Sequence, residues 1–265
     1  MLRDAPYAGS RKRSKRFVQI LDLVGERGAV SLAELAESLG VSAATARRDL
    51  SELADQHLVV RTHGGVRALD HRSELPVELR DTKSRDAKRA IALAVAARIP
   101  HERHAVAFSG GTTTARVAAE LANHPALTIV TNSLSIAELV HSHPQLRVVM
   151  TGGTLRPQSL ELVGALAERT FAAVNIGTAI LGADGVDAVA GVTTHDDTEA
   201  RTNHAMVGSA QRTIVVADGS KVGRVALAQM ASLDLVDMFV TDSSADPAEL
   251  ERIRAAGVEV VVADA

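Results

Sequence analysis

The spacing of apolar residues changes near residue 84, and this change limits the chain to two different folding units. Before residue 84, apolar residues recur at helical spacing in short segments. After it, short apolar runs alternate with amphipathic helical stretches, which is typical of crossover units in a mostly parallel sheet. The sequence therefore predicts an α/β protein in which a small helical unit precedes an open, mostly parallel α/β domain. The expected strands are Ala105–Phe108, Leu127–Thr131, Arg147–Met150, Ile176–Leu181, Thr213–Ala217, Met238–Thr241 and Val258–Val262.

Three helices and a small hairpin are predicted in the first unit. The first helix covers residues 17–25 and ends at two glycines. Ser31 caps the second helix, because Glu34 stands three residues further on and completes a capping box. Ser42 caps the third helix, and two short apolar runs on either side of Gly64 then predict the hairpin.

A helix-turn-helix at about residues 30–49 would place its second helix in the major groove of DNA. Ala46, Leu50 and Leu53 share one face of that helix and are expected to pack on the first two helices. The opposite face is small, hydroxylated and basic, which suits close approach to bases and phosphates. Asp49 is expected to hold an arginine or to cap a neighbour. The residues predicted to contact DNA are Ser42, Ala44, Thr45, Arg47, Arg48, Arg61 and His63.

Two arginines on a helix are more often a solvated face than a DNA contact, so the hairpin decides between these interpretations. Arg61, His63 and Arg67 surround its turn, where a wing would meet the DNA backbone. The charge distribution agrees: residues 1–72 carry 12 Lys and Arg against 9 Asp and Glu, and the remainder carries 17 against 23. A basic end on an acidic body favours a polyanion as the partner of the first unit.

Composition excludes several other classes of protein. The chain has no Cys, and therefore no disulfide, thiolate zinc site or cysteine nucleophile. Aromatic residues make up 2% of the chain, too few to form platforms that stack on single-stranded nucleic acid. The ten His residues show no metal-ligand motif, and no apolar run is long enough to span a bilayer. We expect no metal, no cofactor, no membrane association and a cytoplasmic location.

Glycine-rich and polar segments follow several predicted strands. Ser109–Thr114 opens a helix directly after a strand, and its glycines, amides and hydroxyls suit an anion. Such a loop alone is often only a capped turn, but Thr131–Ser133 and Gly152–Gly153 also end strands. In an open parallel sheet, these ends line one crevice. The residues predicted to bind a ligand are Ser109, Gly110, Gly111, Thr112, Thr113, Thr131, Asn132, Ser133, Gly152, Gly153, Asp184, Glu199, Asp218 and Lys221.

The run VSAATARRDL, which starts at Val41, and the run RTHGG, which starts at Arg61, resemble the DeoR family of bacterial transcription regulators. That family shows VS-x-x-T-(Ile or Val)-RRDL followed by R-x-HGG. Ala46 departs from the pattern, because a larger aliphatic residue is usual there. The resemblance implies a winged helix-turn-helix DNA-binding domain at residues 13–68, a linker at 69–83 and a sugar-phosphate-binding effector domain at 84–265.

The resemblance extends over nearly the whole chain. The C-terminal domain of the family is similar in fold to ribose-5-phosphate and glucosamine-6-phosphate isomerases, which implies a phosphorylated sugar or polyol as the ligand. It also implies phosphate contacts at residues 111–113, with Asp218 and Lys221 near the sugar. The family often has Asp where Ser109 stands, and Asp-Ser-Ser-Lys where this chain has Asp-Gly-Ser-Lys.

Together these features predict a DNA-binding transcription regulator, a repressor of a sugar or polyol catabolic operon whose DNA affinity a phosphorylated sugar controls. Its expected partners are double-stranded operator DNA, the effector, and further copies of the chain in a homo-oligomer. The alternative is a sugar-phosphate isomerase-like enzyme with Glu199 or Asp184 as its base. An enzyme needs neither a reading helix nor a wing, and a purely architectural DNA-binding protein would leave the strand-end residues unexplained.

Overall fold

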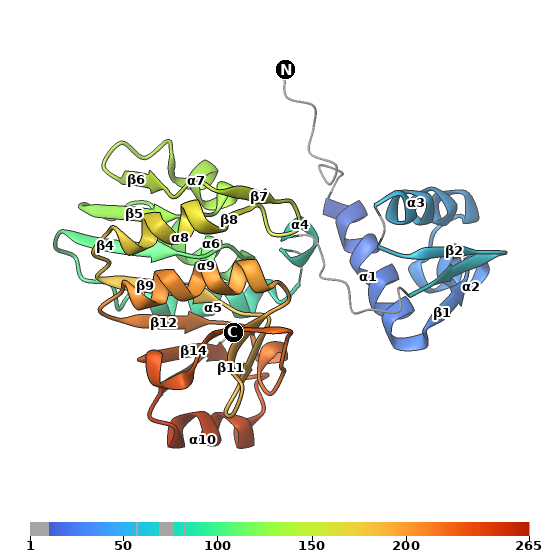
Figure 1. The fold of residues 1–265 in the computed structure, drawn as a ribbon. Helices are drawn as coiled ribbons and strands as arrows, with labels where there is room; N and C mark the ends of the chain where they lie inside the picture. Colours follow the sequence, from blue (N-terminus) through green and yellow to red (C-terminus); the bar gives the residue numbers. More distant parts are fainter. Residues whose placement is uncertain (1–10, 57, 69–76, 82, 265) are drawn as a thin grey trace. The chain divides into compact units, whose positions relative to one another are not determined.

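The chain divides into two compact units, Met1–Lys83 and Ser84–Ala265, and each has a core of its own (Figure 1). No helix in the described part of the chain is long and apolar enough to cross a membrane. The computed structural model describes residues 11–56, 58–68, 77–81 and 83–264.

The first unit joins helices to a three-stranded antiparallel sheet in the order β1-β3-β2. The predicted capping box is confirmed, because Ser31 Oγ accepts a hydrogen bond from Glu34 N and Glu34 Oε2 accepts one from Ser31 N. Ser42 caps the next helix in the same way, through the amide of Thr45. The elements are α1 (Arg11–Arg27), β1 (Ala29–Ser31), α2 (Leu32–Leu39), α3 (Ala43–Asp55), β2 (Val60–Thr62), β3 (Gly65–Arg67) and α4 (Val77–Arg80).

Helix α1 is longer than the sequence predicts at both ends. It passes through Gly25 and stops before Gly28, whose φ of +76° is left-handed. A glycine inside a helix costs about 1 kcal/mol relative to alanine. Burial of Ile20 and Val24 on the inner face of the same helix offsets that cost.

The segment predicted as a linker contains a short helix. Its residues 69–76 lie outside the described part of the chain, but α4 follows them directly. Leu79 of α4 is fully buried in the hydrophobic core of the first unit, and Lys83 Nζ lies 2.5 Å from Asp22 Oδ1 of α1. The structure therefore differs from the prediction for this stretch, because its charged composition concealed one buried leucine.

The second unit is built on a seven-stranded sheet that is parallel throughout, in the order β15-β14-β12-β9-β4-β5-β6. All seven predicted strands are confirmed to within about two residues. They are β4 (His104–Phe108), β5 (Leu127–Thr131), β6 (Arg147–Met150), β9 (Thr178–Gly182), β12 (Thr213–Val216), β14 (Met238–Asp242) and β15 (Glu259–Ala263). The helices are α5 (Arg85–Ala96), α6 (Thr112–Glu120), α7 (Leu134–Val140), α8 (Ala165–Ala172), α9 (Asp197–Gly208) and α10 (Pro247–Ala255).

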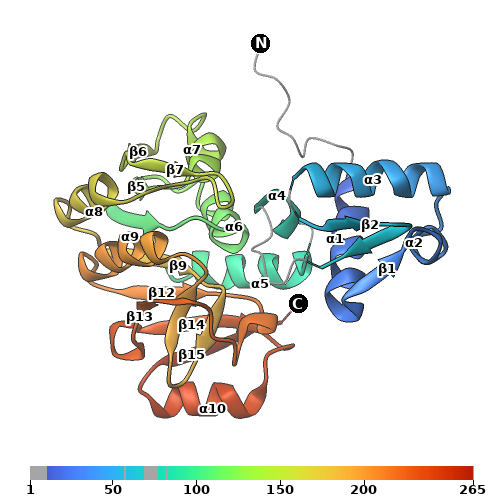
Figure 2. The ribbon, with the colours of Figure 1, turned by 45° about the vertical axis from the view of Figure 1, so that its right-hand side comes forward.

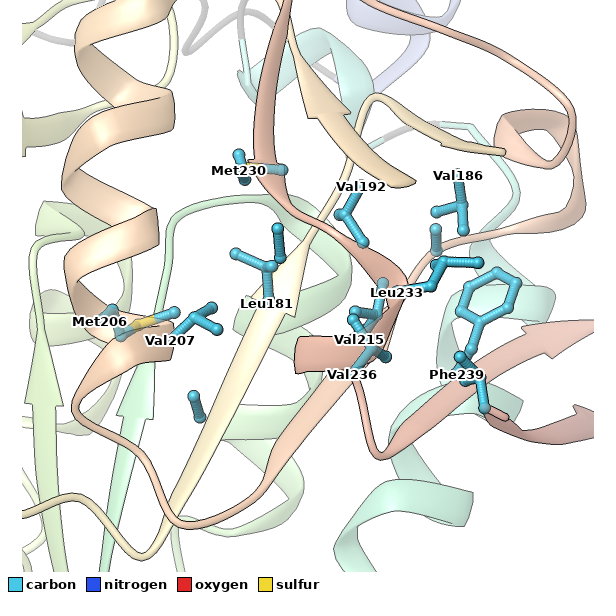
Figure 3. Packing of buried hydrophobic residues seen from close by; sticks show 14 of the residues in the cluster. Leu181, Val186, Val192, Met206, Val207, Val215, Met230, Leu233, Val236 and Phe239 are labelled. Carbon is cyan, nitrogen blue, oxygen red and sulfur yellow. The ribbon is translucent and has the colours of Figure 1, made fainter. Parts of the chain in front are cut away.

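Alternate residues of each central strand point into two hydrophobic cores, one on either face of the sheet. In β4, Val106 and Phe108 face the core formed with α5, α6 and α7, whereas Ala107 faces the core formed with α8, α9 and α10. Figures 1 and 2 show the sheet and the helices that pack against it. Figure 3 shows part of the second core, to which Leu181 of β9 and Met206 of α9 both belong. Both cores are mostly aliphatic, as the low aromatic content requires.

Five short strands lie outside the large sheet. β7 (Thr154–Arg156) and β8 (Glu161–Val163) pair as a hairpin, and β10 (Gly185–Asp187), β11 (Gly191–Thr194) and β13 (Ala228–Ala231) form an antiparallel sheet. The sequence does not predict them, because runs of three or four residues are too short to show alternation.

Candidate functional site

Helix α3 presents the predicted reading face to solvent. Its inner residues Ala46, Leu50 and Leu53 are at most 3% exposed, as the helical periodicity predicts. Arg47 and Arg48 are exposed on the other side. Of the remaining residues predicted on this helix, Thr45 is half-buried and two are exposed, Ser42 and Ala44.

An ion pair holds α3, which we call the reading helix, against α1. Arg16 Nε and Nη2 lie 2.8 and 3.2 Å from the two carboxylate oxygens of Asp49, which is 3% exposed. The hydrogen bond with Asp49 raises the pKa of the Arg16 guanidinium above its ordinary value. Arg13 pairs with Glu52 one turn further along α3. The expectation that Asp49 holds an arginine is confirmed, and the pair sets the tilt of α3.

The hairpin between β2 and β3 lies beside the reading helix. Arg61 Nη1 donates to Ser51 Oγ of α3 at 3.1 Å, so the predicted wing and the reading helix are joined through side chains. Arg61 and His63 are both exposed. Gly65 lets β3 approach β1, because a Cβ there would lie 2.2 Å from the carbonyl oxygen of Val30.

In the second unit, predicted residues gather where the parallel strands end, and we call this set the strand-end cluster. The strand order reverses between β4 and β9, which is where open α/β sheets bind ligands. Ser109 joins these two strands, since its Oγ accepts a hydrogen bond from Gly182 N at 3.0 Å. Thr131 Oγ1 donates to Phe108 O and accepts from Ser133 N, which joins β4 to β5. Ser109, Thr131 and Ser133 are almost fully buried, so they support the cluster from within.

Helix α6 starts in the middle of this cluster. Its N-cap is Gly111, with a φ of +126° and no side chain to cap the helix. The first-turn amides of Thr112 and Thr113 therefore point past the helix end, where the helix dipole favours an anion. Thr112 is half-buried and Thr113 is 8% exposed.

A charged chain lies at the carboxyl end of β9. Thr194 Oγ1 is 2.8 Å from Glu199 Oε1 and 3.1 Å from Asp184 Oδ2. Lys221 Nζ lies 3.3 Å from the other oxygen of Asp184, and Arg156 Nη1 lies 3.1 Å from Glu199 Oε2. Two carboxylates thus share one hydroxyl, whose single proton can satisfy only one of them at a time, and each carboxylate pairs with a cation on its other side.

Asp218 has a local role in the cluster. Its Oδ1 accepts from Ser220 N and Oγ, which forms the turn that carries Lys221. Asp242, which the sequence does not single out, accepts from Gly219 N at 2.7 Å and from Ser244 N at 3.0 Å. Burial favours a raised pKa for the Asp242 carboxyl, but these amides outweigh burial and leave its pKa below the ordinary value.

Sequence reasoning missed two charged residues of the cluster, Arg156 and Glu161. They face each other across the β7–β8 hairpin, and Gly152 and Gly153 precede it with φ of +71° and +131°. Glu161 is 1% exposed, and its Oε1 accepts from Gly110 N at 2.6 Å. Glu161 is a buried carboxylate between two less buried leucines, which reverses the pattern expected of a strand. No signal in the sequence predicts this burial, which depends on the fold.

Asn132 is also part of this set, because its Nδ2 donates to Glu161 Oε1 at 3.3 Å. The structure therefore brings together, around the ends of β4, β5 and β9, most of the residues predicted to bind a ligand. Among the described residues, no group of three His, Cys, Asp or Glu side chains is placed to hold a metal ion.

A helix-turn-helix with a wing, joined in one chain to an α/β domain with an anion-friendly strand-end cluster, defines a ligand-responsive DNA-binding protein. Sequence models agree with both halves: residues 16–72 match the DeoR-like helix-turn-helix domain, and residues 83–243 match the DeoR C-terminal sensor domain. The chain belongs to the DeoR family of transcription regulators. It is a DNA-binding regulator and not the isomerase-like enzyme considered as the alternative.

Similar proteins are regulators over their full length. The HTH-type transcriptional regulator GlpR of Haloferax volcanii is 37% identical over 94% of this chain and 97% of its own. The glycerol-3-phosphate regulon repressor of Escherichia coli K12 is 34% identical over 88% of this chain and 92% of its own. Ribose 5-phosphate isomerase A of Neisseria gonorrhoeae is 17% identical, with a TM-score of 0.38 over 51% of this chain and 52% of its own, and no inference rests on that similarity.

Proposed function

We propose that this regulator is a repressor of a sugar or polyol catabolic operon and that a phosphorylated sugar controls its affinity for operator DNA. The observation that carries the proposal is the uncapped start of α6 at the strand-order reversal, in a chain that also carries an exposed basic reading helix. The names of its relatives support the same class of effector, since one of them is a glycerol-3-phosphate regulon repressor.

The DNA contacts follow from exposure and charge. The reading helix inserts its first turns into the major groove, and Arg48 contacts a base edge or a phosphate there. The wing residues Arg61 and His63 contact the DNA backbone. The reading helix contributes Ser42, Ala44, Thr45, Arg47 and Arg48 to this surface.

In the strand-end cluster, the ligand's phosphate binds the amides and hydroxyls of residues 111–113, with Gly110 beside them. Its hydroxyls then extend toward Asp184, Glu199 and Lys221, where the carboxylates accept hydrogen bonds and the ammonium group donates them. The buried residues Ser109, Thr131, Asn132, Ser133 and Asp218 hold this arrangement in place, and Gly152 and Gly153 let the backbone pass close to it.

Control of transcription requires the ligand to favour one DNA-binding state over another. A coupling of about 1–3 kcal/mol changes DNA affinity roughly 5–150-fold. One winged module buries little DNA surface, so we propose a homo-oligomer that binds repeated or palindromic half-sites. We place the DNA-binding domain at residues 13–68, the connection at 69–83, the effector domain at 84–265, and the protein in the cytoplasm, where the operator lies.

The test is a screen of sugar phosphates by thermal shift, followed by gel shifts with operator DNA selected in vitro. We expect one class of sugar phosphate to raise the melting temperature and change DNA affinity, without turnover. Replacing both Thr112 and Thr113 by alanine removes the ligand's effect and leaves ligand-free DNA binding intact. Thr128→Ala, on the half-buried face of β5, is the matched control. A ligand that is rapidly isomerised while DNA affinity stays constant contradicts the proposal.

A further inference from the structure

Glu161 places a buried carboxylate against the loop that carries the proposed phosphate site. Its Oε1 accepts hydrogen bonds from Gly110 N at 2.6 Å and from Asn132 Nδ2 at 3.3 Å, and the residue is 1% exposed. A loop amide two residues before the start of α6 is therefore bonded to an anion that belongs to the chain itself. A bound phosphate adds a second anion at the same loop.

The loop is shaped around this carboxylate. A Cβ at Gly110 would lie 2.4 Å from both Cγ and Cδ of Glu161, closer than carbon atoms approach in folded proteins. Any side chain at position 110 would thus displace the side chain of Glu161.

Glu161 is also connected to the other half of the strand-end cluster. It is the first residue of β8 and lies opposite Arg156 of β7, which pairs with Glu199 and Asp196. The hairpin therefore places the Glu161 carboxylate against the loop after β4 and the Arg156 guanidinium against α9. A shift of the β8 backbone at Glu161 is passed to Arg156, because the two residues are paired in the hairpin.

Both ends of this hairpin, and the residue before Glu161, have left-handed backbone conformations. Gly153 before β7 and Gly164 after β8 have φ of +131° and +93°, values that other residues rarely adopt. Leu160, directly before Glu161, has a φ of +54° although it is not a glycine. Such a backbone conformation costs of order 1 kcal/mol and is maintained only by its surroundings. Here the surroundings include the bond from Glu161 to the loop.

We propose that Glu161 is an intramolecular competitor of the effector's phosphate. In the ligand-free protein its carboxylate holds the Gly110 amide, while backbone hydrogen bonds from Leu162 N to Asn132 O and from Leu134 N to Leu160 O hold β8 beside the loop. Phosphate at the start of α6 repels the carboxylate, which leaves the loop and shifts the paired residues of β7 with it. This proposal rests on the proposed function, and it adds a residue that sets effector affinity and reports occupancy.

The first measurement is the affinity of the full chain for inorganic phosphate by calorimetry. Glu161→Gln keeps the shape and an acceptor oxygen but removes the charge. We expect it to bind phosphate at least about tenfold more tightly than the parent. Two like charges a few ångström apart near a protein surface repel each other by more than the free energy that corresponds to a tenfold change in affinity. Glu138→Gln on the exposed face of α7 removes the same charge elsewhere and leaves the affinity unchanged.

The second measurement follows the hairpin directly. The chain has no Cys, so Leu155→Cys on β7, where the leucine is 45% exposed, accepts a single fluorescent label. We expect phosphate to change the emission of the label in the parent chain. In the Glu161→Gln background, phosphate binds but leaves the emission unchanged, because the amide carries no charge for phosphate to repel.

The outcomes separate the two proposals. If neither the parent nor Glu161→Gln binds phosphate or any sugar phosphate, the proposed ligand site is wrong and the competitor falls with it. If both bind equally, or Glu161→Gln binds more weakly, Glu161 only shapes the loop, and the competitor proposal is overturned while the site stands. If phosphate binds the parent chain but leaves the emission of the label at position 155 unchanged, the proposed movement of the hairpin is overturned.

Discussion

The reading face of the first unit and the strand-end cluster of the second use polar residues in opposite ways. On α3, the side chains expected to contact DNA are exposed, and the contact that holds the helix comes from Asp49 on its other face. At the strand ends, residues such as Thr131 and Asn132 are fully buried and bonded to neighbouring strands. Exposed side chains that contact a large partner such as DNA need not contribute to the stability of the fold. Buried side chains that form a site for a small polar ligand also hold neighbouring strands together.

We therefore expect replacements on the reading face to change DNA affinity and to leave the free energy of unfolding unchanged. Replacements in the strand-end cluster are expected to lower the free energy of unfolding.

The largest effect is expected for Thr131→Val. The replacement is nearly isosteric, but it removes the donor to Phe108 O and leaves the buried amide of Ser133 without its acceptor. Two such losses cost about 3 kcal/mol of unfolding free energy. Urea denaturation followed by circular dichroism measures this, with Thr128→Val in the same strand as the control. Equal stabilities of the two variants would show that the cluster is not part of the fold's support.

The next effect is expected for Arg48→Ala. The side chain is exposed opposite the buried face of α3, so its loss leaves the unfolding free energy unchanged. Loss of a base or phosphate contact weakens operator binding by about 2 kcal/mol, or roughly 30-fold. Gel-shift titration checks the affinity. Arg27→Ala at the exposed end of α1 removes the same charge away from the reading face, and a similar loss there would point to net charge as the cause.

A smaller, pH-dependent effect is expected for Asp242→Asn. The amides of Gly219 and Ser244 hold the pKa of this carboxyl below its ordinary value despite burial. A group with a lowered folded pKa stabilises the fold above its unfolded pKa of about 4, and that contribution is lost as the pH falls through the folded value. The variant therefore loses about 1.5 kcal/mol at neutral pH and progressively less in acid.

Denaturation at pH 7 and at about pH 3 measures this difference, with the exposed Asp234→Asn as the control. A loss that is the same at both pH values would mean that packing, and not the charge of Asp242, supports the turn.

The smallest effect is expected for Ser42→Ala, which tests where the comparison breaks down. Ser42 is exposed on the reading face, yet its Oγ caps α3 through Thr45 N. Loss of an N-cap costs about 1 kcal/mol. This one replacement is expected to lower both thermal stability and DNA affinity. Unchanged thermal stability would assign Ser42 to DNA contact alone.

The fold could be predicted from the sequence wherever burial was continuous or periodic. Strands such as β9 and β12 are buried on both faces, so they stand out as apolar runs. The caps at Ser31 and Ser42 were also predicted, because a capping hydrogen bond depends only on residues within one turn. α4 was not predicted, because one buried leucine in a charged segment shows no helical spacing of apolar residues.

The strand-end cluster could be predicted only in part. Its glycine and threonine loops follow strands along the sequence, and the parallel sheet then brings their ends together. Glu161 and Arg156 reach the cluster from a hairpin of three-residue strands, and their partners Gly110 and Glu199 lie about 40–50 residues away. Burial of Glu161 between Leu160 and Leu162 reverses the alternation expected of a strand. Contacts of this kind depend on tertiary packing, which no local pattern encodes.

The strand order has a consequence for synthesis of the chain. β4 pairs on one side with β5, which follows within about 20 residues, and on the other with β9, where Phe108 is paired with Ile180 roughly 70 residues later. At ribosomal rates of about 5–20 residues per second, the inner edge of β4 waits roughly 4–14 s for its partner. During that interval an apolar half-sheet of β4, β5 and β6 has an open edge at what becomes its centre, and open edges promote aggregation. The strand order at the candidate site thus leaves the nascent chain with an open sheet edge until β9 has been made.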